Sequence, residues 1–374
     1  MADSNNRYLT SQILLDLQRK MVFLSGPRQV GKTTLANSIL KRLGGTYLNW
    51  DYAPHRKILL KQELTVEGFL VLDEIHKYRS WRNYLKGIYD IHREKLKILV
   101  TGSAKLDHYR RGGDSLQGRY HMLRLHPLSV AELEIDNLND LNQLMQLSGF
   151  PEPFFGKDAI EAKRWSEEYR QRLIYDEIRD LEKIVDLGKL ELLMLRIPDL
   201  VGSPLSINAL REDLEVSHKA VSHWLTILER LYYLYRIPPF GAKKLRALKK
   251  EQKAYLYDWS LPEDPGSKFE NLIAGHLLKW VHFRHDVYGE RYELRYFRDV
   301  DKREIDFILL LKGKPIKAIE CKLSKEDISP PLTYFKKKFP EVEAMQVCLD
   351  PVREYTNGEG VRLVSAMKFL RTLI

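Results

Sequence analysis

The sequence has few cysteines, no long apolar run and no excess of acidic residues. Its 374 residues include only two cysteines, Cys321 and Cys348. Two cysteines provide neither a disulfide framework nor the ligand spacing of a zinc site, which is typical of a reducing compartment. No apolar run approaches the roughly 20 residues of a membrane span, and the polar start lacks the pattern of a secretory signal. We therefore expect a cytoplasmic protein that does not associate with membranes.

Basic residues outnumber acidic ones and give a formal net charge of +10. Such a balance favours a polyanionic partner, nucleic acid before membrane, although a generally basic protein remains an alternative. The hydrophobic content of 44% together with 30% charged residues is typical of a globular chain. A chain of this length predicts two or three domains.

A glycine-containing loop lies between a predicted strand at residues 21–24 and a predicted helix at residues 35–40. The loop has the GxxxxGK[ST] spacing, whose backbone N–H groups surround phosphates at a helix N-terminus. Lys32 is expected to reach the β- and γ-phosphates, and Thr33 to supply a hydroxyl to Mg²⁺. The cofactors predicted are therefore ATP and Mg²⁺. The nucleotide-binding residues are Gly26, Pro27, Arg28, Gln29, Val30, Gly31, Lys32, Thr33 and Thr34.

Polar side chains follow two further predicted strands. Asp73 and Glu74 end an apolar run, at the edge where ligands bind in open α/β sheets. We expect Asp73 to hold Mg²⁺ and Glu74 to orient and deprotonate the attacking water. Thr101 and Ser103 end the strand at residues 98–100 and are candidates for hydrogen bonding to the γ-phosphate or the water. An ordinary polar strand end is the alternative for this last pair.

These segments resemble an uncharacterised group of bacterial and archaeal AAA+ ATPases that carry a C-terminal domain of unknown function. The resemblance covers nearly the whole chain and rests on residues 26–34, 71–76, 101–103, 116–119 and 127–129. It implies a ring of about six subunits, in which Arg119 is a finger delivered to the neighbour's nucleotide. A surface arginine is the alternative for Arg119. No lid arginine of the AAA+ kind is evident.

Residues 128–187 are charged and helical in pattern, and we expect a helical lid or linker. Residues 188–254 predict a winged helix-turn-helix, because Ser206 and Ser217 can cap two helices joined by a short turn. Its surface and the basic run after it are candidates for DNA contact, with a purely structural winged helix and a solvated charge run as alternatives. The predicted DNA-contacting residues are His218, Lys219, Ser222, His223, Lys243, Lys244, Arg246, Lys249 and Lys250.

Residues 255–374 hold a second set of acids and resemble the PD-(D/E)xK, restriction-endonuclease-like fold. Matching that pattern, Glu270 is the helical acid, Asp306 and Glu320 are ligands of a second Mg²⁺, and Lys322 positions the water. The chemistry needs carboxylates that concentrate a cation beside the scissile phosphate. The sequence departs from the pattern in having Ile305 before Asp306. A nuclease fold that no longer cleaves, or a simple buried ion pair, is the alternative.

The expected fold class is thus α/β. A P-loop AAA+ core with a parallel sheet (1–127) is followed by the lid (128–187), the winged helix-turn-helix (188–254) and the nuclease-like domain (255–374). The leading hypothesis is an ATP-hydrolysing protein that binds duplex or branched DNA and remodels, translocates along or loads onto it. Two alternatives stay open: a Mg²⁺-dependent DNA nuclease gated by ATP, and a non-motor, nucleotide-switched regulator or scaffold.

Overall fold

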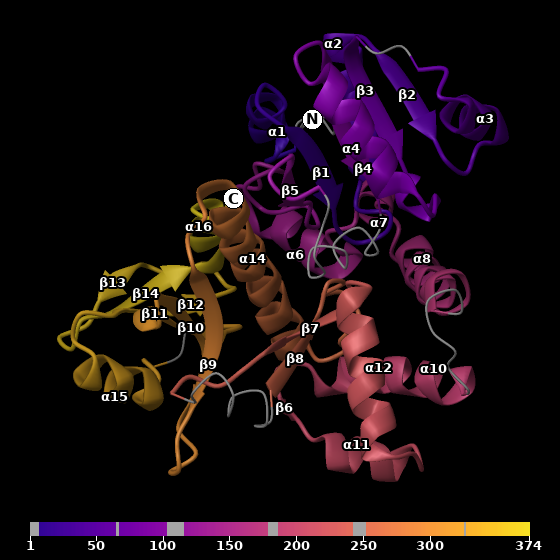
Figure 1. Cartoon of the computed structure of the whole chain (residues 1–374). Helices are drawn as coiled ribbons and strands as arrows, with labels where there is room; N and C mark the ends of the chain where they lie inside the picture. Colours follow the sequence, from indigo (N-terminus) through magenta and orange to yellow (C-terminus); the bar gives the residue numbers. More distant parts are fainter. Residues whose placement is uncertain (1–6, 65–66, 103–115, 179–185, 242–251, 325–326) are drawn as a thin grey trace. The chain divides into compact units, whose positions relative to one another are not determined.

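The computed structural model describes residues 7–64, 67–102, 116–178, 186–241, 252–324 and 327–374 (Figure 1). The chain divides into two compact units. Unit 1 is Met1–Pro127 with Asp286–Tyr288, and unit 2 is Leu128–His285 with Gly289–Ile374. Unit 1 holds one sheet and unit 2 holds two.

Unit 1 is built on a five-stranded parallel sheet with the order β2-β3-β4-β1-β5. This confirms the α/β class and the parallel sheet expected for the first part of the chain. On one face, Phe23 and Leu72 of the sheet share a buried cluster with Trp81 and Leu85. The strands are β1 (Met21–Ser25), β2 (Thr46–Asn49), β3 (Gly68–Asp73), β4 (Leu96–Thr101) and β5 (Tyr120–Arg124), and the α-helices are α1 (Thr10–Asp16), α2 (Lys32–Leu43), α3 (Ala53–Lys61) and α4 (Trp81–His92).

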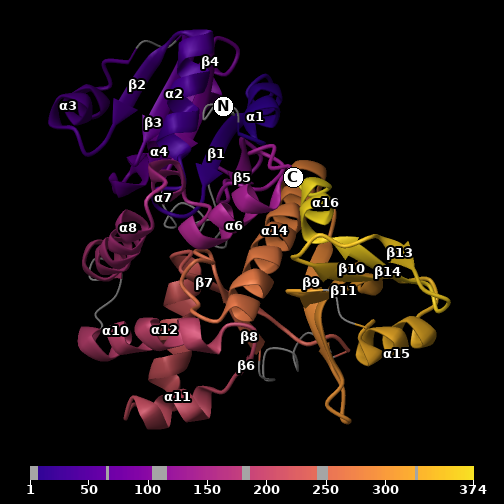
Figure 2. The same ribbon diagram turned by 180° about the vertical axis from the view of Figure 1, so that it is seen from behind.

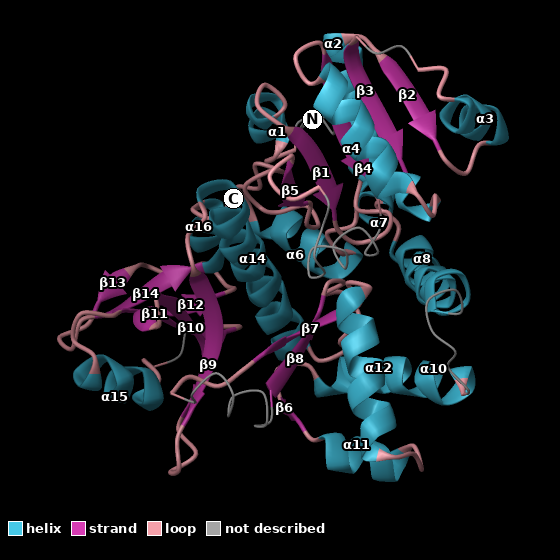
Figure 3. Cartoon of the chain, in the orientation of Figure 1, coloured by secondary structure: helices cyan, strands magenta, loops and turns pink. Residues whose placement is uncertain are grey.

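Unit 2 begins with helices, as expected for the lid or linker (Figure 3). Asn137 and Asp158 accept hydrogen bonds from N–H groups in the first turns of α6 and α8, which explains where these helices start. Phe150 packs against the rings of Trp165 and Tyr169 at centroid distances of 5.0 and 5.2 Å. The helices are α6 (Leu138–Leu147), α7 (Pro151–Gly156), α8 (Ala159–Arg172) and α10 (Leu187–Arg196), with a π-helical turn at Leu173–Ile178.

Two helices and a small antiparallel sheet follow. Ser206 and Ser217 cap α11 (Ile207–Asp213) and α12 (His218–Arg230) by accepting from the N–H groups of Ala209 and Ala220. The sheet has the order β6-β8-β7 and consists of β6 (Pro204–Leu205), β7 (Leu234–Ile237) and β8 (Gln252–Leu256). The boundary expected between residues 254 and 255 falls inside β8, so the residues on either side of it share one strand.

The C-terminal part of unit 2 is a six-stranded mixed sheet with the order β13-β14-β12-β11-β10-β9. Leu332 and Phe335 of α15 (Pro330–Lys338) pack on Ile308 and Ala344 of this sheet, and Figure 2 shows α15 beside it. The remaining elements are α14 (Pro265–Tyr288), β9 (Tyr292–Arg298), β10 (Glu304–Leu311), β11 (Lys314–Lys322), β12 (Glu343–Cys348), β13 (Tyr355–Thr356), β14 (Val361–Ser365) and α16 (Ala366–Arg371).

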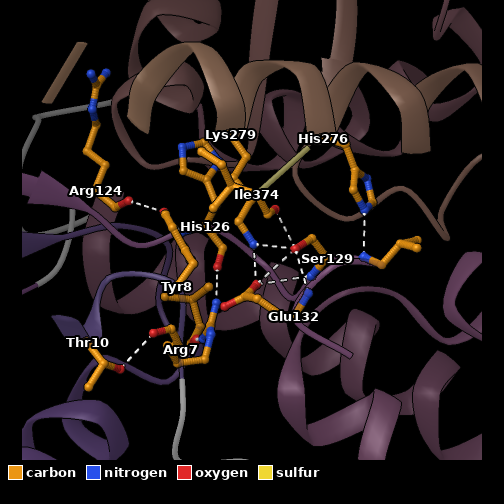
Figure 4. A network of polar contacts seen from close by, with 12 residues as sticks. Arg7, Tyr8, Thr10, Arg124, His126, Ser129, Glu132, His276, Lys279 and Ile374 are labelled. Carbon is orange, nitrogen blue, oxygen red and sulfur yellow. Dashed lines mark hydrogen bonds and ion pairs between the residues drawn. The ribbon is translucent and has the colours of Figure 1, made fainter. Parts of the chain in front are cut away.

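A buried polar network joins α14 to the segment that opens unit 2 (Figure 4). The Lys279 ammonium donates to Ser129 Oγ at 2.9 Å and forms an ion pair with Glu132. His276 Nε2 accepts the Val130 N–H at 3.1 Å, so its Nδ1 carries the proton and donates to Leu272 O at 2.8 Å. Within the described residues, no helix is both long and apolar enough to cross a bilayer.

Candidate functional site

The loop after β1 has a backbone conformation that requires glycine at both glycine positions of the pattern. Gly26 has φ +143°, and a Cβ there would lie 2.2 Å from the Leu125 carbonyl oxygen. Gly31 has φ +97° and directly precedes the first residue of α2. Both conformations strongly disfavour other residues, so the sequence pattern encodes a specific loop shape.

The donors of this loop converge at the start of α2. Lys32 is buried, and its Nζ donates to the carbonyls of Gly26 and Pro27 at 3.0 and 2.5 Å. Gly31, the N-cap of α2, offers no side-chain acceptor to the first amides of the helix. A buried ammonium beside uncapped helix amides is the chemistry that holds a phosphate chain. These residues therefore fit the phosphates of a nucleotide.

Four side chains donate to the Asp73 carboxylate. Its Oδ2 accepts from Thr33 Oγ1 at 3.0 Å and from Tyr47 OH at 2.7 Å, and more weakly from Asn49 Nδ2 at 3.4 Å. Its Oδ1 accepts from Thr101 Oγ1 at 2.6 Å. The structure thus brings together Thr33 and Asp73, the expected ligands of Mg²⁺, and adds the predicted Thr101. A hydroxyl and a carboxylate beside a phosphate site fit Mg²⁺.

Tyr47 and Asn49 belong to this cluster although the sequence analysis did not single them out. Parallel register places Asn49 opposite Asp73, and Asp73 opposite Thr101, so the three strand ends meet at one edge. Burial, and next the hydrogen bond to Asp73, raise the pKa of Tyr47 well above its usual value. Tyr47 therefore stays protonated and remains a donor. The available signal was that residues 46–49 form a neighbouring strand ending at the same edge.

Glu74, the predicted base, sits directly after β3 in a left-handed conformation with φ +58°. Its N–H donates to the Thr101 carbonyl at 3.0 Å, and its carboxylate lies 3.4 Å from Lys77 Nζ and 3.5 Å from His76 Nε2. Burial alone would lower the pKa of Lys77, but the carboxylates of Asp51 and Glu74 outweigh it and raise that pKa. The carboxylate of Glu74 is therefore engaged by an ammonium. Ser103, the other predicted sensor hydroxyl, lies outside the described residues.

Arg7 links the loop after β1 to the residues that follow β5, and Figure 4 shows its contact with His126. Its guanidinium donates to the Val30 carbonyl at 2.8 Å and to the His126 carbonyl at 2.5 Å. Next to it, the Tyr8 hydroxyl donates to the Arg124 carbonyl at 2.5 Å. A single arginine ahead of the first helix follows no sequence pattern, so this support was not predicted.

Arg119, the predicted finger, forms a two-point ion pair with Asp90 at 2.6 and 3.0 Å. It precedes β5, and its carbonyl accepts the N–H of Met21, the first residue of β1. Arg119 therefore lies at the amino end of β1, whereas the nucleotide loop follows the carboxyl end, about 15 Å away for five strand residues. It does not approach the loop of its own chain, and its action on a neighbour stays a prediction.

The predicted DNA-contacting face of α12 is open. His218, Lys219 and His223 are exposed and Ser222 is half-buried. Val221, Trp224, Leu225 and Leu228 on the same helix are buried, as the apolar spacing predicted. The predicted basic residues Lys243, Lys244, Arg246, Lys249 and Lys250 lie outside the described residues.

The nuclease-like residues Glu270, Asp306, Glu320 and Lys322 come from α14, β10 and β11. The antiparallel register pairs Phe307 with Ile319, which brings Asp306 opposite Glu320. Burial, and then the charge of Asp306, raise the pKa of Glu270 to about 7 and that of Glu320 to about 8. The carboxylates are therefore close enough to repel one another.

A lysine that the sequence analysis did not select lies among these acids. Lys253 Nζ is 3.3 Å from Glu270 Oε1 and 3.5 Å from Asp306 Oδ1. Glu320 is instead 3.5 Å from Lys322, and its buried Oε2 has no hydrogen-bond partner among the described residues. In the described part of the chain, no three His, Cys, Asp or Glu side chains are grouped to hold a metal ion. The acids as arranged do not fit the second Mg²⁺ site.

Three segments of the chain match models of known families. Residues 18–134 match the model of an AAA domain. Residues 138–262 and 265–369 match two domains of unknown function, DUF8612 and DUF4143. The expected AAA domain followed by a C-terminal domain of unknown function is confirmed, with two such domains in place of one, and an AAA domain implies nucleotide binding.

The related proteins are distant and uncharacterized. A protein of Mycobacterium tuberculosis is 21% identical over 244 residues, which cover 64% of this chain and 55% of that protein. A protein of Methanocaldococcus jannaschii is 21% identical over 295 residues, 64% of this chain and 61% of that protein. The chain therefore spans little more than half the length of these curated relatives.

Two solved structures are similar only weakly. The DNA clamp loader delta protein of Bacillus subtilis has a TM-score of 0.30 and 9% identity, covering 59% of this chain and 88% of that one. Bacteroides sp Pif1 in complex with ADP-AlF4 has a TM-score of 0.23 and 13% identity, covering 40% and 48%. Scores this low carry no argument about function. The geometry of the loop and the family match together identify an AAA domain, followed by two domains of unknown function.

Proposed function

We propose that this protein hydrolyses ATP and uses the free energy to remodel, translocate along or load onto DNA, including branched DNA. The observation that carries the proposal is the Asp73 carboxylate, which Thr33 and Thr101 contact beside the buried Lys32. The match of residues 18–134 to an AAA domain supports it. ATP hydrolysis requires a phosphate site, a Mg²⁺ site and a base, and unit 1 offers candidates for all three.

Each residue has a defined task in this proposal. Lys32 gives up its two loop carbonyls and binds the β- and γ-phosphates, while Thr33 and Asp73 hold the cation. Bound Mg²⁺ATP supplies the transferable phosphoryl group and a charge that stabilises its transfer. Glu74 leaves Lys77 and accepts a proton from the attacking water. Arg119, from a neighbouring subunit of a hexameric ring, stabilises the transferring phosphoryl group.

DNA binding is proposed for the part of unit 2 between β6 and β8. Two capped helices and a three-stranded antiparallel sheet form the arrangement of a winged helix-turn-helix. Lys219 and the two histidines of α12 are exposed, whereas the apolar residues of the same helix are buried. The net charge of +10 favours a polyanionic partner. For the C-terminal sheet with α14, we propose the restriction-endonuclease-like fold.

The decisive experiment is the rate of ATP hydrolysis with and without single-stranded, duplex and four-way-junction DNA, at two salt concentrations. We expect DNA to stimulate hydrolysis, with less stimulation at high salt because phosphate contacts release counterions. Lys32→Ala removes the phosphate contact and should abolish turnover, whereas Lys41→Ala, on the exposed side of α2, should not. Slow turnover that DNA leaves unchanged would instead support a nucleotide-switched scaffold.

A further inference from the structure

The acids of the C-terminal sheet surround a buried ammonium. Lys253, on β8, has a side chain that is only 1% exposed. Its Nζ lies 2.7 Å from Glu304 Oε1, 3.3 Å from Glu270 Oε1 and 3.5 Å from Asp306 Oδ1. One lysine thus contacts carboxylates from α14 and β10. The three carboxylates around Nζ keep Lys253 protonated, because its deprotonation would leave these acids without a counter-charge.

The neighbours of Lys253 hold this arrangement in place. The hydroxyl of Tyr255, two residues further along β8, donates to Glu270 Oε1 at 2.6 Å. The Cys321 N–H donates to Asp306 Oδ2 at 2.9 Å, so one oxygen of Asp306 faces the backbone and the other faces Lys253. The ring of Tyr296 lies 5.6 Å from Nζ, within the range of a cation–π contact.

Gly202 lies close to the Glu270 carboxylate. Gly202 has φ +79°, and a Cβ there would lie 2.9 Å from Glu270 Oε2. Its N–H donates to the Ala254 carbonyl at 3.4 Å, so the segment before β6 is tied to the strand that carries Lys253. The backbone at Gly202 therefore packs directly against the Glu270 carboxylate.

A divalent cation needs oxygens at about 2.0–2.6 Å, and these acids are instead spread around an ammonium. Lys253 contacts Asp306, one of the two expected metal ligands. Glu320, the other expected ligand, is paired with Lys322. Lys253 thus occupies one oxygen each of Glu270 and Asp306 that a divalent cation would use.

We propose that Lys253 is the resident cation of this carboxylate cluster, which ties β8 to α14 and β10 and makes the C-terminal domain a metal-independent module that does not cleave DNA. The positive charge that a nuclease of this fold takes from Mg²⁺ comes here from the chain itself. This inference concerns unit 2 alone and holds whether or not ATP hydrolysis acts on DNA.

The first test measures the melting temperature of the full-length protein without nucleotide, in EDTA, Mg²⁺ or Mn²⁺. The wild-type protein should show no metal-induced shift that depends on Asp306. Lys253→Met leaves the acids without their counter-charge and should lower the melting temperature by roughly 10 °C, since breaking a buried ion pair is strongly destabilising. The matched control Lys163→Met removes an exposed lysine from α8 and should melt like the wild type.

A second variant keeps the proposal testable if Lys253→Met does not fold. Lys253→Met/Asp306→Asn removes one charge of each sign and should melt above Lys253→Met, because fewer acids remain unpaired. A wild-type melting shift with Mn²⁺ that Asp306→Asn abolishes would overturn the proposal. So would nicking of plasmid DNA in Mg²⁺ or Mn²⁺ that the same substitution abolishes, while intact plasmid in both metals supports it.

Discussion

At the scale of single residues, unit 1 holds Lys32 and Glu74 in contacts that a bound nucleotide would replace. Lys32 donates to two carbonyls of its own loop, and Glu74 is held near Lys77. Lys77 is also paired with Asp51, so its contact with Glu74 can be exchanged. The arrangement is that of a closed loop ready to bind an anion.

Glu74→Gln should separate nucleotide binding from hydrolysis. The amide keeps the shape of the side chain but cannot accept the proton of the attacking water, so ATP should bind normally and turn over at least 100-fold more slowly. Binding of a fluorescent ATP analogue and a phosphate-release assay measure the two effects. The control Glu67→Gln changes an exposed acid before β3. Hydrolysis at the wild-type rate by Glu74→Gln would remove Glu74 from the role of base.

Arg7→Gln tests the support behind the loop. The guanidinium is buried and donates to Val30 and His126, and loss of a charged hydrogen bond costs about 1.5–3 kcal/mol. We expect lower stability of unit 1 and weaker ATP binding, measured by urea unfolding and by titration with nucleotide. Arg42→Gln, on an exposed position of α2, should change neither. Equal ATP affinity for Arg7→Gln and wild type would mean that the loop holds its shape without Arg7.

At the scale of elements, sequence patterns correctly predicted the strands, helices and caps whose residues are close together in the chain. Strand, loop and helix at residues 21–43 were predicted because the glycines and the apolar residues are consecutive. The caps of α11 and α12 were also predicted from adjacent residues. Lys253 was not, because its partners Glu270 and Asp306 are 17 and 53 residues away in the chain. Only the packing of β8 against α14 and β10 shows that the lysine belongs to the acids.

His276 makes the docking of α14 dependent on pH. Burial lowers its pKa to about 4, and its Nε2 must stay unprotonated to accept the Val130 N–H. The folded state therefore resists protonation, while the unfolded chain takes up a proton below about pH 6.5. This contribution to stability is complete above about pH 6.5 and declines as the pH falls toward 4.

The measurement compares wild type with His276→Gln, whose amide oxygen can accept the same N–H. The free energy of unfolding of the wild type relative to the variant should fall by roughly 2 kcal/mol between about pH 7.5 and pH 5. The comparison is needed because the raised pKa values of Glu270 and Glu320 change stability with pH in the opposite direction. A difference that stays constant over this range would show that His276 is not the titrating group.

Helix α12 carries the prediction about DNA contact. Lys219 is exposed near its N-terminus, so Lys219→Ala should weaken binding to every DNA sequence alike and lower the slope of log K against log salt by about one. Fluorescence anisotropy with a labelled duplex at several salt concentrations measures both quantities. Lys163→Ala, on α8, is the control of equal charge change. An unchanged slope would place the DNA elsewhere or exclude it from α12.

At the scale of the whole molecule, unit 1 holds candidates for every nucleotide contact except the arginine finger. Arg119 is paired with Asp90 at the amino end of β1, while the loop lies beyond the carboxyl end of the same strand. The sequence resemblance predicted a finger but not its direction of action. Because Arg119 does not approach the nucleotide loop of its own chain, the proposed finger role requires a second copy of the chain.

Mixing two inactive variants tests this directly. Arg119→Ala keeps its nucleotide site but offers no finger, and Lys32→Ala offers a finger but cannot bind the phosphates. Each alone should be inactive, since a finger contributes about 10³–10⁵ in rate. In a ring assembled randomly from equal amounts, about a quarter of the sites join an intact loop to an intact finger, so about a quarter of the activity should return.

The control mixes Lys32→Ala with Lys32→Ala/Arg119→Ala, which restores no site. If the first mixture stays as inactive as the second, although size-exclusion chromatography shows mixed rings, Arg119 is not a finger, and its pairing with Asp90 is its only role.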